Sequence, residues 1–184
     1  MKTRNCIFIF ILFLAGCQAP AELGGASQRV DPREYPRDVR TSGLSRGDYA
    51  PEFSVIGIDG KTYTLSDFSG SPLLLEFFAT WCPYCDKDFR ALGTVYAEYP
   101  EVTILAIDLD LKEDSDTIRH YKYGYSGIER VVFSLGNEKI LRDYSIRLTT
   151  TKYAIGRDGR ILYAGSGAFS AEQWKILLEE MRKG

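Results

Sequence analysis

The sequence has few of the residues that build metal sites or disulfide networks. It contains 4 cysteines and 1 histidine among 184 residues, and Cys6 and Cys17 lie close to the N-terminus. The other two, Cys82 and Cys85, are too few for a four-cysteine zinc site, and His120 with these two thiols would still need a further ligand. We therefore expect no resident metal and no cofactor, and we expect His120 on the surface of a short helix.

The chain also lacks a strong excess of charge of either sign. Its formal net charge is −2 and its pI is near 5.5, so it has no basic field that would hold nucleic acid. Apolar residues make up 45% of the sequence, which is enough to bury a core in a chain of this length. These values predict one folded domain with an extension and exclude a nucleic-acid-binding protein.

The apolar run near the N-terminus is too short to span a membrane. It covers residues 7–14, whereas a spanning helix needs about 20 residues. It follows Lys2 and Arg4 and leads into Leu14-Ala15-Gly16-Cys17, which is the arrangement of a secretory signal. The last four residues resemble the bacterial lipobox, which implies cleavage before Cys17 and a lipid on its sulfur. The alternative is an ordinary signal peptide with a coincidental cysteine.

The lipobox interpretation divides the chain into three parts. We expect a lipoprotein signal peptide over residues 1–16, a lipidated cysteine with a flexible tether over 17–47, and a folded domain over 48–184. Gln18 follows the cysteine in place of aspartate, so we expect the outer membrane if the cell is Gram-negative. The mature protein would keep only Cys82 and Cys85 as thiols, in a compartment where disulfides persist.

One stretch joins a predicted buried strand, a Cys-x-x-Cys turn and a helix. Residues 73–78 are apolar except for Glu76, which is typical of a central strand covered on both faces. After the turn, apolar residues recur at helical spacing, and we expect this helix to end near Tyr99-Pro100. Cys82 would lie at the helix start, where unpaired N–H groups and the dipole favour the reactive thiolate. Cys85 would lie one turn further on, close enough to form a disulfide with Cys82.

The rest of the sequence predicts an alternation of strands and helices around this stretch. Turn dipeptides such as Asp59-Gly60 separate pairs of apolar runs, and Ser170 with Gln173 forms a capping box before a last helix. We expect strands over 102–107 and 131–133, helices over 117–123 and 137–144, and hairpins over 53–65 and 153–163.

These motifs resemble the thioredoxin superfamily, and most closely its membrane-anchored TlpA/ResA-type members. The matching residues are Ala50-Pro51-Glu52-Phe53, residues 59–68, Phe78-Ala79-Thr80-Trp81-Cys82 and residues 157–161, and the likeness covers about residues 48–184. A bare Cys-x-x-Cys is a weak signal, but it is specific after a strand, behind Ala-Thr-Trp and before a helix. The resemblance implies a thioredoxin-like α/β fold: a central mixed β-sheet flanked by helices, with an N-terminal β-hairpin and a central insertion over 111–142.

The resemblance also implies a function. It indicates a thiol–disulfide oxidoreductase of the cell envelope that reduces disulfides in exported proteins such as apocytochrome c, with electrons from a membrane donor of the DsbD/CcdA type. Cys82 would be the nucleophile and Cys85 the resolving thiol, and we expect a monomer. The alternatives are a thiol peroxidase, whose Thr-x-x-Cys spacing Thr80 does not match, a non-catalytic interaction module, and an oxidase or isomerase.

Supporting residues follow from the same comparison. Glu76 occupies the position of the buried acid of thioredoxins and would take the proton from Cys85 with a raised pKa; alternatively it reaches solvent at a strand end. Asp88 occupies the position of an active-site glutamate of ResA-type proteins; alternatively it only stabilises the helix start. Pro83-Tyr84 matches the dipeptide usual in glutaredoxins, which implies glutathione as an alternative reductant. The ring of Tyr84 would contact a partner peptide, and Trp81 is a supporting residue of the family motif.

The sequence departs from the family at Thr150. Relatives have Thr-Pro-Thr where this chain has Thr149-Thr150-Thr151, and their proline is cis and receives the substrate backbone. Because a cis bond before a residue other than proline costs about 3 kcal/mol, we expect the peptide before Thr150 to be trans. This departure puts substrate docking in doubt but leaves the redox pair in place.

Overall fold

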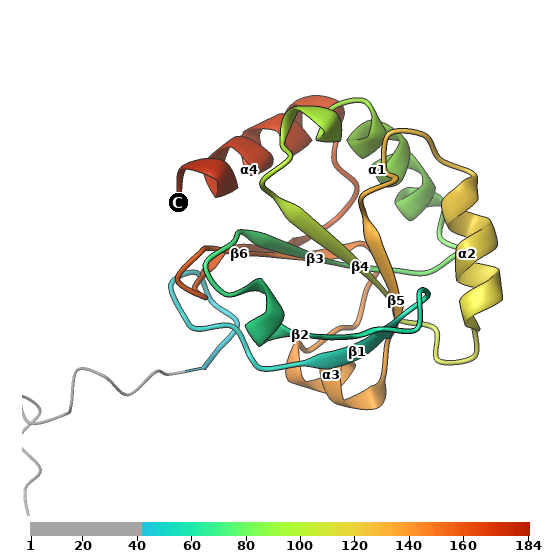
Figure 1. Ribbon diagram of the computed structural model, residues 1–184, viewed down its shortest axis with the longest axis horizontal. Helices are drawn as coiled ribbons and strands as arrows, with labels where there is room; N and C mark the ends of the chain where they lie inside the picture. Colours follow the sequence, from blue (N-terminus) through green and yellow to red (C-terminus); the bar gives the residue numbers. More distant parts are fainter. Residues whose placement is uncertain (1–41) are drawn as a thin grey trace, which may run out of the picture. The chain divides into compact units, whose positions relative to one another are not determined.

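The computed structural model describes residues 42–184 and has a seven-stranded mixed sheet at its centre. The strand order is β2-β1-β5-β4-β3-β6-β7 (Figure 1). Strands β3 (Leu73–Phe78), β4 (Thr103–Asp108) and β5 (Val132–Leu135) are parallel to one another. The predicted mixed sheet flanked by helices is therefore confirmed, whereas the predicted signal peptide over 1–16 and Cys17 lie outside the described residues.

Strand β3 lies inside the sheet, between β4 and β6, and every one of its six residues is buried. Leu74 and Phe78 belong to a core cluster that also contains residues of α1 (Pro83–Gly93), α2 (Ser115–Tyr123) and α4 (Ala171–Lys183). Leu75 and Phe77 belong to a second cluster with residues of α3 (Glu138–Asp143). Figure 1 shows α1 and α4 on one side of the sheet and α3 on the other. The apolar run is thus covered on both faces, as predicted.

Both predicted hairpins form. Strands β1 (Ser54–Gly57) and β2 (Thr62–Thr64) pair antiparallel, and Gly60 between them has a φ of 81°, a left-handed conformation that glycine adopts without strain. Strands β6 (Thr151–Ile155) and β7 (Ile161–Ser166) pair antiparallel at the other edge. The N-terminal hairpin joins the sheet where β1 pairs antiparallel with β5.

Side-chain caps explain where the later helices begin. Asp114, Asn137 and Ser170 precede α2, α3 and α4, and the side-chain oxygen of each accepts a backbone N–H of the first turn. Ser170 and Gln173 form the predicted capping box. The predicted insertion over 111–142 contains α2, β5 and most of α3.

Helix α1 is shorter than predicted. It ends at Gly93, and a separate short 3₁₀-helix, η2 (Tyr96–Glu98), continues towards Tyr99. A Cβ atom at Gly93 would lie 2.2 Å from the carbonyl oxygen of Ser126. The close approach of this loop thus requires glycine at a position that weakens the helix, and the expected end near Tyr99-Pro100 was wrong.

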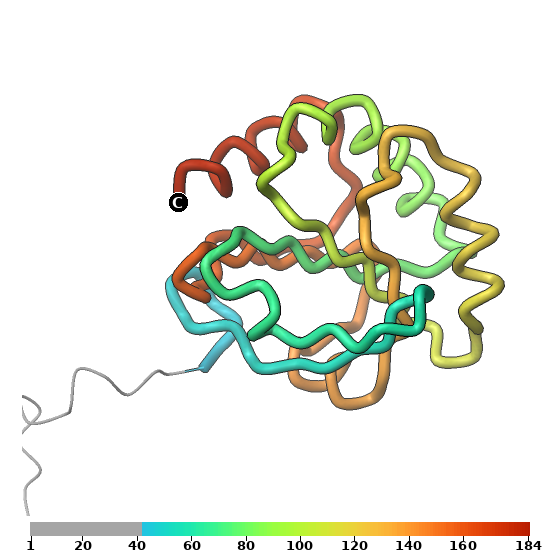
Figure 2. The backbone as a smooth tube through the Cα atoms, viewed as in Figure 1, coloured from blue at the N-terminus to red at the C-terminus, as the bar shows by residue number. Residues whose placement is uncertain are grey.

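The first described residues run beside the turn between β6 and β7, as Figure 2 shows. The backbone N–H of Gly47 donates to Ile161 O at 2.8 Å, and that of Ala50 donates to Gly159 O at 3.0 Å. These bonds attach the start of the domain to its C-terminal hairpin. No helix between Ser42 and Gly184 is both long and apolar enough to cross a membrane.

Candidate active site

Cys82 and Cys85 lie at the start of α1, just beyond the end of β3. Cys82 is the N-cap residue and Pro83 the first helical residue, a position that suits proline because its missing N–H needs no partner there. Both cysteines are free thiols with at most 2% of their surface exposed. Cys82 Sγ accepts the N–H of Cys85 at 3.2 Å and shares a hydrogen bond with Thr149 Oγ1 at 3.0 Å. The geometry therefore presents hydrogen-bond donors to a sulfur anion at Cys82.

The two thiols differ in acidity. Burial raises the pKa of Cys82, but hydrogen bonds from Cys85, Thr149 and the backbone N–H groups of Cys85 and Tyr84 outweigh it and hold the pKa below its ordinary value. Burial raises the pKa of Cys85 far above the ordinary value, and its hydrogen bond with Cys82 and the nearby Glu76 add to this effect. The pair thus combines an easily ionised thiol with one that holds its proton, as attack by Cys82 requires.

Three ionisable side chains are completely buried beside the cysteines: Glu76, Asp88 and Lys152. Burial raises the pKa of Glu76 well above its ordinary value; the positive charge of Lys152 opposes this rise and the negative charge of Asp88 adds to it. Glu76 does not reach solvent, so the alternative interpretation of that residue does not apply. Its role in proton transfer stays a prediction.

Asp88 is a buried hydrogen-bond acceptor, not an exposed carboxylate at a helix start. It forms an ion pair with Lys152. Asp88 Oδ1 accepts the backbone N–H of Phe169 at 2.8 Å and Trp174 Nε1–H at 2.9 Å. Asp88 therefore connects α1 to β6, to α4 and to the loop before α4.

Sequence reasoning did not identify Lys152 or Thr149. Lys152 is completely buried and lies directly opposite Glu76 in the antiparallel pairing of β3 with β6. A lysine directly before the apolar run of a predicted strand was the available signal, because a buried lysine must find a partner. Thr149 was named only as part of the segment that aligns with Thr-Pro-Thr; its hydrogen bond with Cys82, 67 residues away along the chain, comes from the structure.

The peptide bond between Thr149 and Thr150 is cis, so the expected trans bond was wrong. Thr150 is completely buried. Its carbonyl oxygen accepts the N–H of Gly167 at 2.9 Å, and its hydroxyl accepts Lys152 Nζ at 3.0 Å. The expectation considered only local peptide geometry, whereas these tertiary contacts hold the Thr149–Thr150 segment in place.

Exposed apolar side chains surround the buried Cys82. Trp81 and Tyr84, within two residues of it, are 63% and 61% exposed, and Leu148, next to Thr149, is 62% exposed. Trp81 Nε1 donates to Asp110 Oδ2 at 2.9 Å, which fixes the indole over the loop after β4. We call Trp81, Tyr84 and Leu148 the apolar rim. A surface of this kind suits contact with an unfolded, apolar polypeptide segment.

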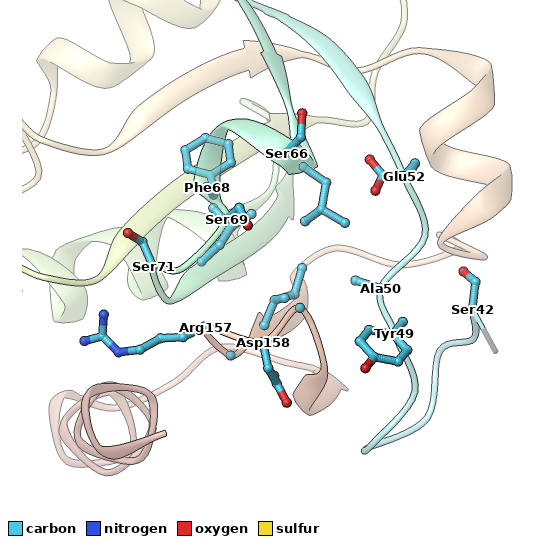
Figure 3. Close-up of a pocket in the computed structure, with 15 residues that line it drawn as sticks. Ser42, Tyr49, Ala50, Glu52, Ser66, Phe68, Ser69, Ser71, Arg157 and Asp158 are labelled. Atoms are coloured by element: carbon cyan, nitrogen blue, oxygen red, sulfur yellow. The ribbon is translucent and has the colours of Figure 1, made fainter. Parts of the chain in front are cut away.

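A cavity of about 560 Å³ lies elsewhere, at the opposite end of β3. Figure 3 shows Ser66, Ser69 and Phe68 on one side of it and Arg157 and Asp158 on another. Leu73, the first residue of β3, lines this cavity, whereas the cysteines follow the last residue of that strand. The cavity is therefore separate from the thiols.

The described residues do not bring together a set of metal ligands. Over residues 42–184, no three His, Cys, Asp or Glu side chains are grouped so that they could hold a metal ion. His120 lies exposed on α2, at the surface position that the sequence predicted.

The chain matches a family model and a curated relative over most of its length. Residues 46–164 match the model of the AhpC/TSA family. Over 183 residues the chain is 31% identical to the thiol-disulfide oxidoreductase ResA of Bacillus thuringiensis subsp. konkukian, covering 100% of this chain and 98% of the relative.

Solved structures share the fold. A thiol:disulfide interchange protein of the thioredoxin family from Chlorobium tepidum TLS has a TM-score of 0.62 at 20% identity, over 76% of this chain and 99% of that chain. The pneumococcal exposed lipoprotein thioredoxin Etrx1 from Streptococcus pneumoniae has a TM-score of 0.57 at 24% identity, over 71% and 99%. The architecture is thus thioredoxin-like.

Proposed function

The chain belongs to the AhpC/TSA family and, within it, to the ResA-type thiol-disulfide oxidoreductases, and on this premise we propose that Cys82 and Cys85 are its redox couple. The observation that carries the proposal is the N-cap position of Cys82, whose sulfur accepts the N–H of Cys85 and hydrogen-bonds with Thr149 Oγ1, while the neighbouring Cys85 is completely buried. A sulfur held in this way is the more nucleophilic of the two thiols, and Cys85 acts only after a mixed disulfide has formed.

In the reductive direction the reaction has two steps. The Cys82 thiolate attacks one sulfur of a substrate disulfide, a Cys82–substrate disulfide forms, and the other substrate sulfur leaves as a thiolate. Cys85 then loses its proton and attacks Cys82, which releases the second substrate thiolate and leaves a Cys82–Cys85 disulfide. Glu76 in its ionised form would accept the Cys85 proton, and its raised pKa makes it a stronger base than an ordinary carboxylate.

The substrates we propose are disulfides of exported proteins, with apocytochrome c as the specific candidate. The apolar rim is the support for a substrate that is unfolded, because its exposed apolar side chains can contact an unfolded segment beside the buried thiol. The test is to mix the reduced protein with apocytochrome c whose haem-attachment cysteines are oxidised, then to alkylate and count free thiols. Transfer of both electrons to apocytochrome c supports the proposal. Reduction of other unfolded proteins at an equal rate would make apocytochrome c one substrate among many.

Replacing residues of the apolar rim should weaken substrate binding without slowing the chemistry. For Tyr84→Ser and Leu148→Ser we expect KM for an unfolded protein disulfide to rise roughly 5- to 30-fold, since exposed contact residues of this kind contribute about 1–2 kcal/mol each. The rate with a small aromatic disulfide should stay unchanged, because that substrate needs only Cys82.

Two matched variants serve as controls for this prediction. Tyr123 and Ile176 are 78% and 61% exposed but lie on α2 and α4, away from the start of α1. Tyr123→Ser and Ile176→Ser should leave both rates unchanged. A rise in KM for the control variants equal to that of the rim variants would remove the rim from the proposal.

We also propose that a lipid on Cys17 holds the protein in the cell envelope, in the outer membrane if the cell is Gram-negative, with a membrane donor of the DsbD/CcdA type supplying electrons. The support is the sequence Leu14-Ala15-Gly16-Cys17; in addition, the name of one structural relative describes it as an exposed lipoprotein. For Cys17→Ser we expect the protein to move from the membrane fraction to the soluble fraction, whereas Cys6→Ser should not change its distribution. Equal membrane retention of Cys17→Ser would contradict a lipid anchor at this cysteine.

A further inference from the structure

The ammonium group of Lys152 has three hydrogen-bond partners in the buried cluster. Its ammonium group forms an ion pair with Asp88 and donates to Thr150 Oγ1 at 3.0 Å and to Gly167 O at 3.1 Å. An ammonium group has three protons to donate, and these three partners use all of them. Glu76 Oε1 lies 3.8 Å away from Lys152 Nζ, so Lys152 acts on Glu76 through its charge.

The two buried acids therefore have different surroundings. Asp88 accepts hydrogen bonds from Lys152, from the backbone N–H of Phe169 and from the indole of Trp174. Neither carboxyl oxygen of Glu76 has a hydrogen-bond partner. The two acids share one cation, but Asp88 is hydrogen-bonded to it whereas Glu76 lies 3.8 Å from it.

Few other groups act on Glu76. Helix α1 presents Cys85 and Asp88 to it, and β6 presents Lys152. On the other side of Glu76, the residue that β4 places opposite it is Ala106, and alanine carries no charge. The protonation of Glu76 therefore depends on one cation, one anion and one thiol.

Building on the proposed function, we infer that Lys152 is a positioning residue: it holds Asp88 by an ion pair and places a positive charge beside Glu76, so that Glu76 can ionise and exchange the proton of Cys85. Without Lys152 the cluster would hold two acids and no cation, and ionising Glu76 would place an uncompensated charge in the core. Lys152 also donates to Thr150, next to the Thr149 that bonds Cys82. One side chain thus contacts the surroundings of both cysteines.

The two chemical steps can be followed separately with an aromatic disulfide that releases a coloured thiolate. Attack by Cys82 releases the first thiolate and leaves an adduct on Cys82, and attack by Cys85 on that adduct releases the second. The first phase reports on Cys82, and the pH dependence of the second reports on the group that accepts the Cys85 proton. Glu76→Gln should slow the second phase and remove its pH dependence below the range in which Cys85 itself ionises.

Two variants isolate the charge of Lys152 without leaving Asp88 buried and unpaired. In Asp88→Asn, Lys152 keeps its charge beside Glu76, and we expect the pH midpoint of the second phase to fall. In Asp88→Asn/Lys152→Met the cation and the anion are both absent, and we expect the midpoint to rise above that of Asp88→Asn by about one pH unit or more. The rate of the first phase is recorded for both variants, because Lys152 also donates to Thr150, next to the Thr149 that bonds Cys82.

The outcomes distinguish this inference from the proposed function. Equal midpoints in Asp88→Asn and Asp88→Asn/Lys152→Met would overturn the role of Lys152, even if both variants were slow. If the protein without substitutions released the first thiolate but never the second, this result would instead contradict Cys85 as the resolving thiol. Thermal unfolding of each variant shows whether it is folded. A second comparison is between Lys152→Arg, which keeps a cation at this position, and Lys152→Met, which has none. The pH midpoint of the second phase should be lower in Lys152→Arg than in Lys152→Met, and equal pH midpoints would also overturn the inference.

Discussion

Replacing Cys82 with serine should lower the rate of disulfide reduction by roughly 10⁴-fold or more, the scale seen when a nucleophile is removed. The sulfur of Cys82 is the group at which the hydrogen bonds of Cys85 and Thr149 converge, whereas Cys85 is completely buried and does not ionise readily. The measurement is the rate at which the reduced protein opens the disulfide of an unfolded protein substrate, followed by alkylation of the released thiols.

The fold should survive this change, which makes the result interpretable. Serine is a preferred N-cap residue, so the hydroxyl introduced by Cys82→Ser would accept the N–H of Cys85 as the sulfur does in the structure. We expect the midpoint of thermal unfolding of Cys82→Ser to stay within a few degrees of that of the reduced parent protein. Residual activity above a tenth of the parent value in a folded Cys82→Ser variant would contradict the assignment of the nucleophile.

Replacing Cys85 with serine should trap the first intermediate. Cys82 keeps its position and its hydrogen bond with Thr149, so it still attacks the substrate, but no thiol remains to displace the product. We expect nearly one substrate molecule to become bound per protein molecule, seen as an increase in intact mass that a small dithiol reverses. In the parent protein the same adduct should be transient.

The trapping experiment has a matched control and a clear negative result. The double variant Cys82→Ser/Cys85→Ser should form no adduct, because Cys82 and Cys85 are the only thiols between Ser42 and Gly184. If Cys85→Ser released reduced substrate repeatedly without a small dithiol, Cys85 would not be the resolving thiol. If it formed no adduct while folded, the protein would be better described as a binding module.

Much of the fold could be predicted because its signals are local. The apolar run at Leu73–Phe78 marks a strand covered on both faces, and a turn glycine and a capping serine mark where a hairpin and a helix begin. The position of Cys82 as the N-cap of α1 also follows from the sequence, because Pro83 suits the first helical position. These features depend on residues that are neighbours along the chain.

The features that sequence reasoning missed depend on contacts between distant segments. Lys152 pairs with Asp88, 64 residues away along the chain, and its meeting with Glu76 follows from the register of β3 with β6. The cis bond before Thr150 opposes the local preference and occurs where Lys152 and Gly167 bond that residue. The early end of α1 at Gly93 depends on the loop at Ser126. A single sequence does not contain the pairing that decides any of these features.

The reduction potential of the Cys82–Cys85 couple tests the central claim most directly. The protein would be equilibrated across a series of thiol–disulfide buffers, and its redox state would be read by alkylation of Cys82 and Cys85. We expect a potential below about −220 mV, on the reducing side of the range known for such couples. A potential near about −120 mV would indicate an oxidant and contradict the proposed reductase, and a pair that never changed state would contradict a redox function altogether.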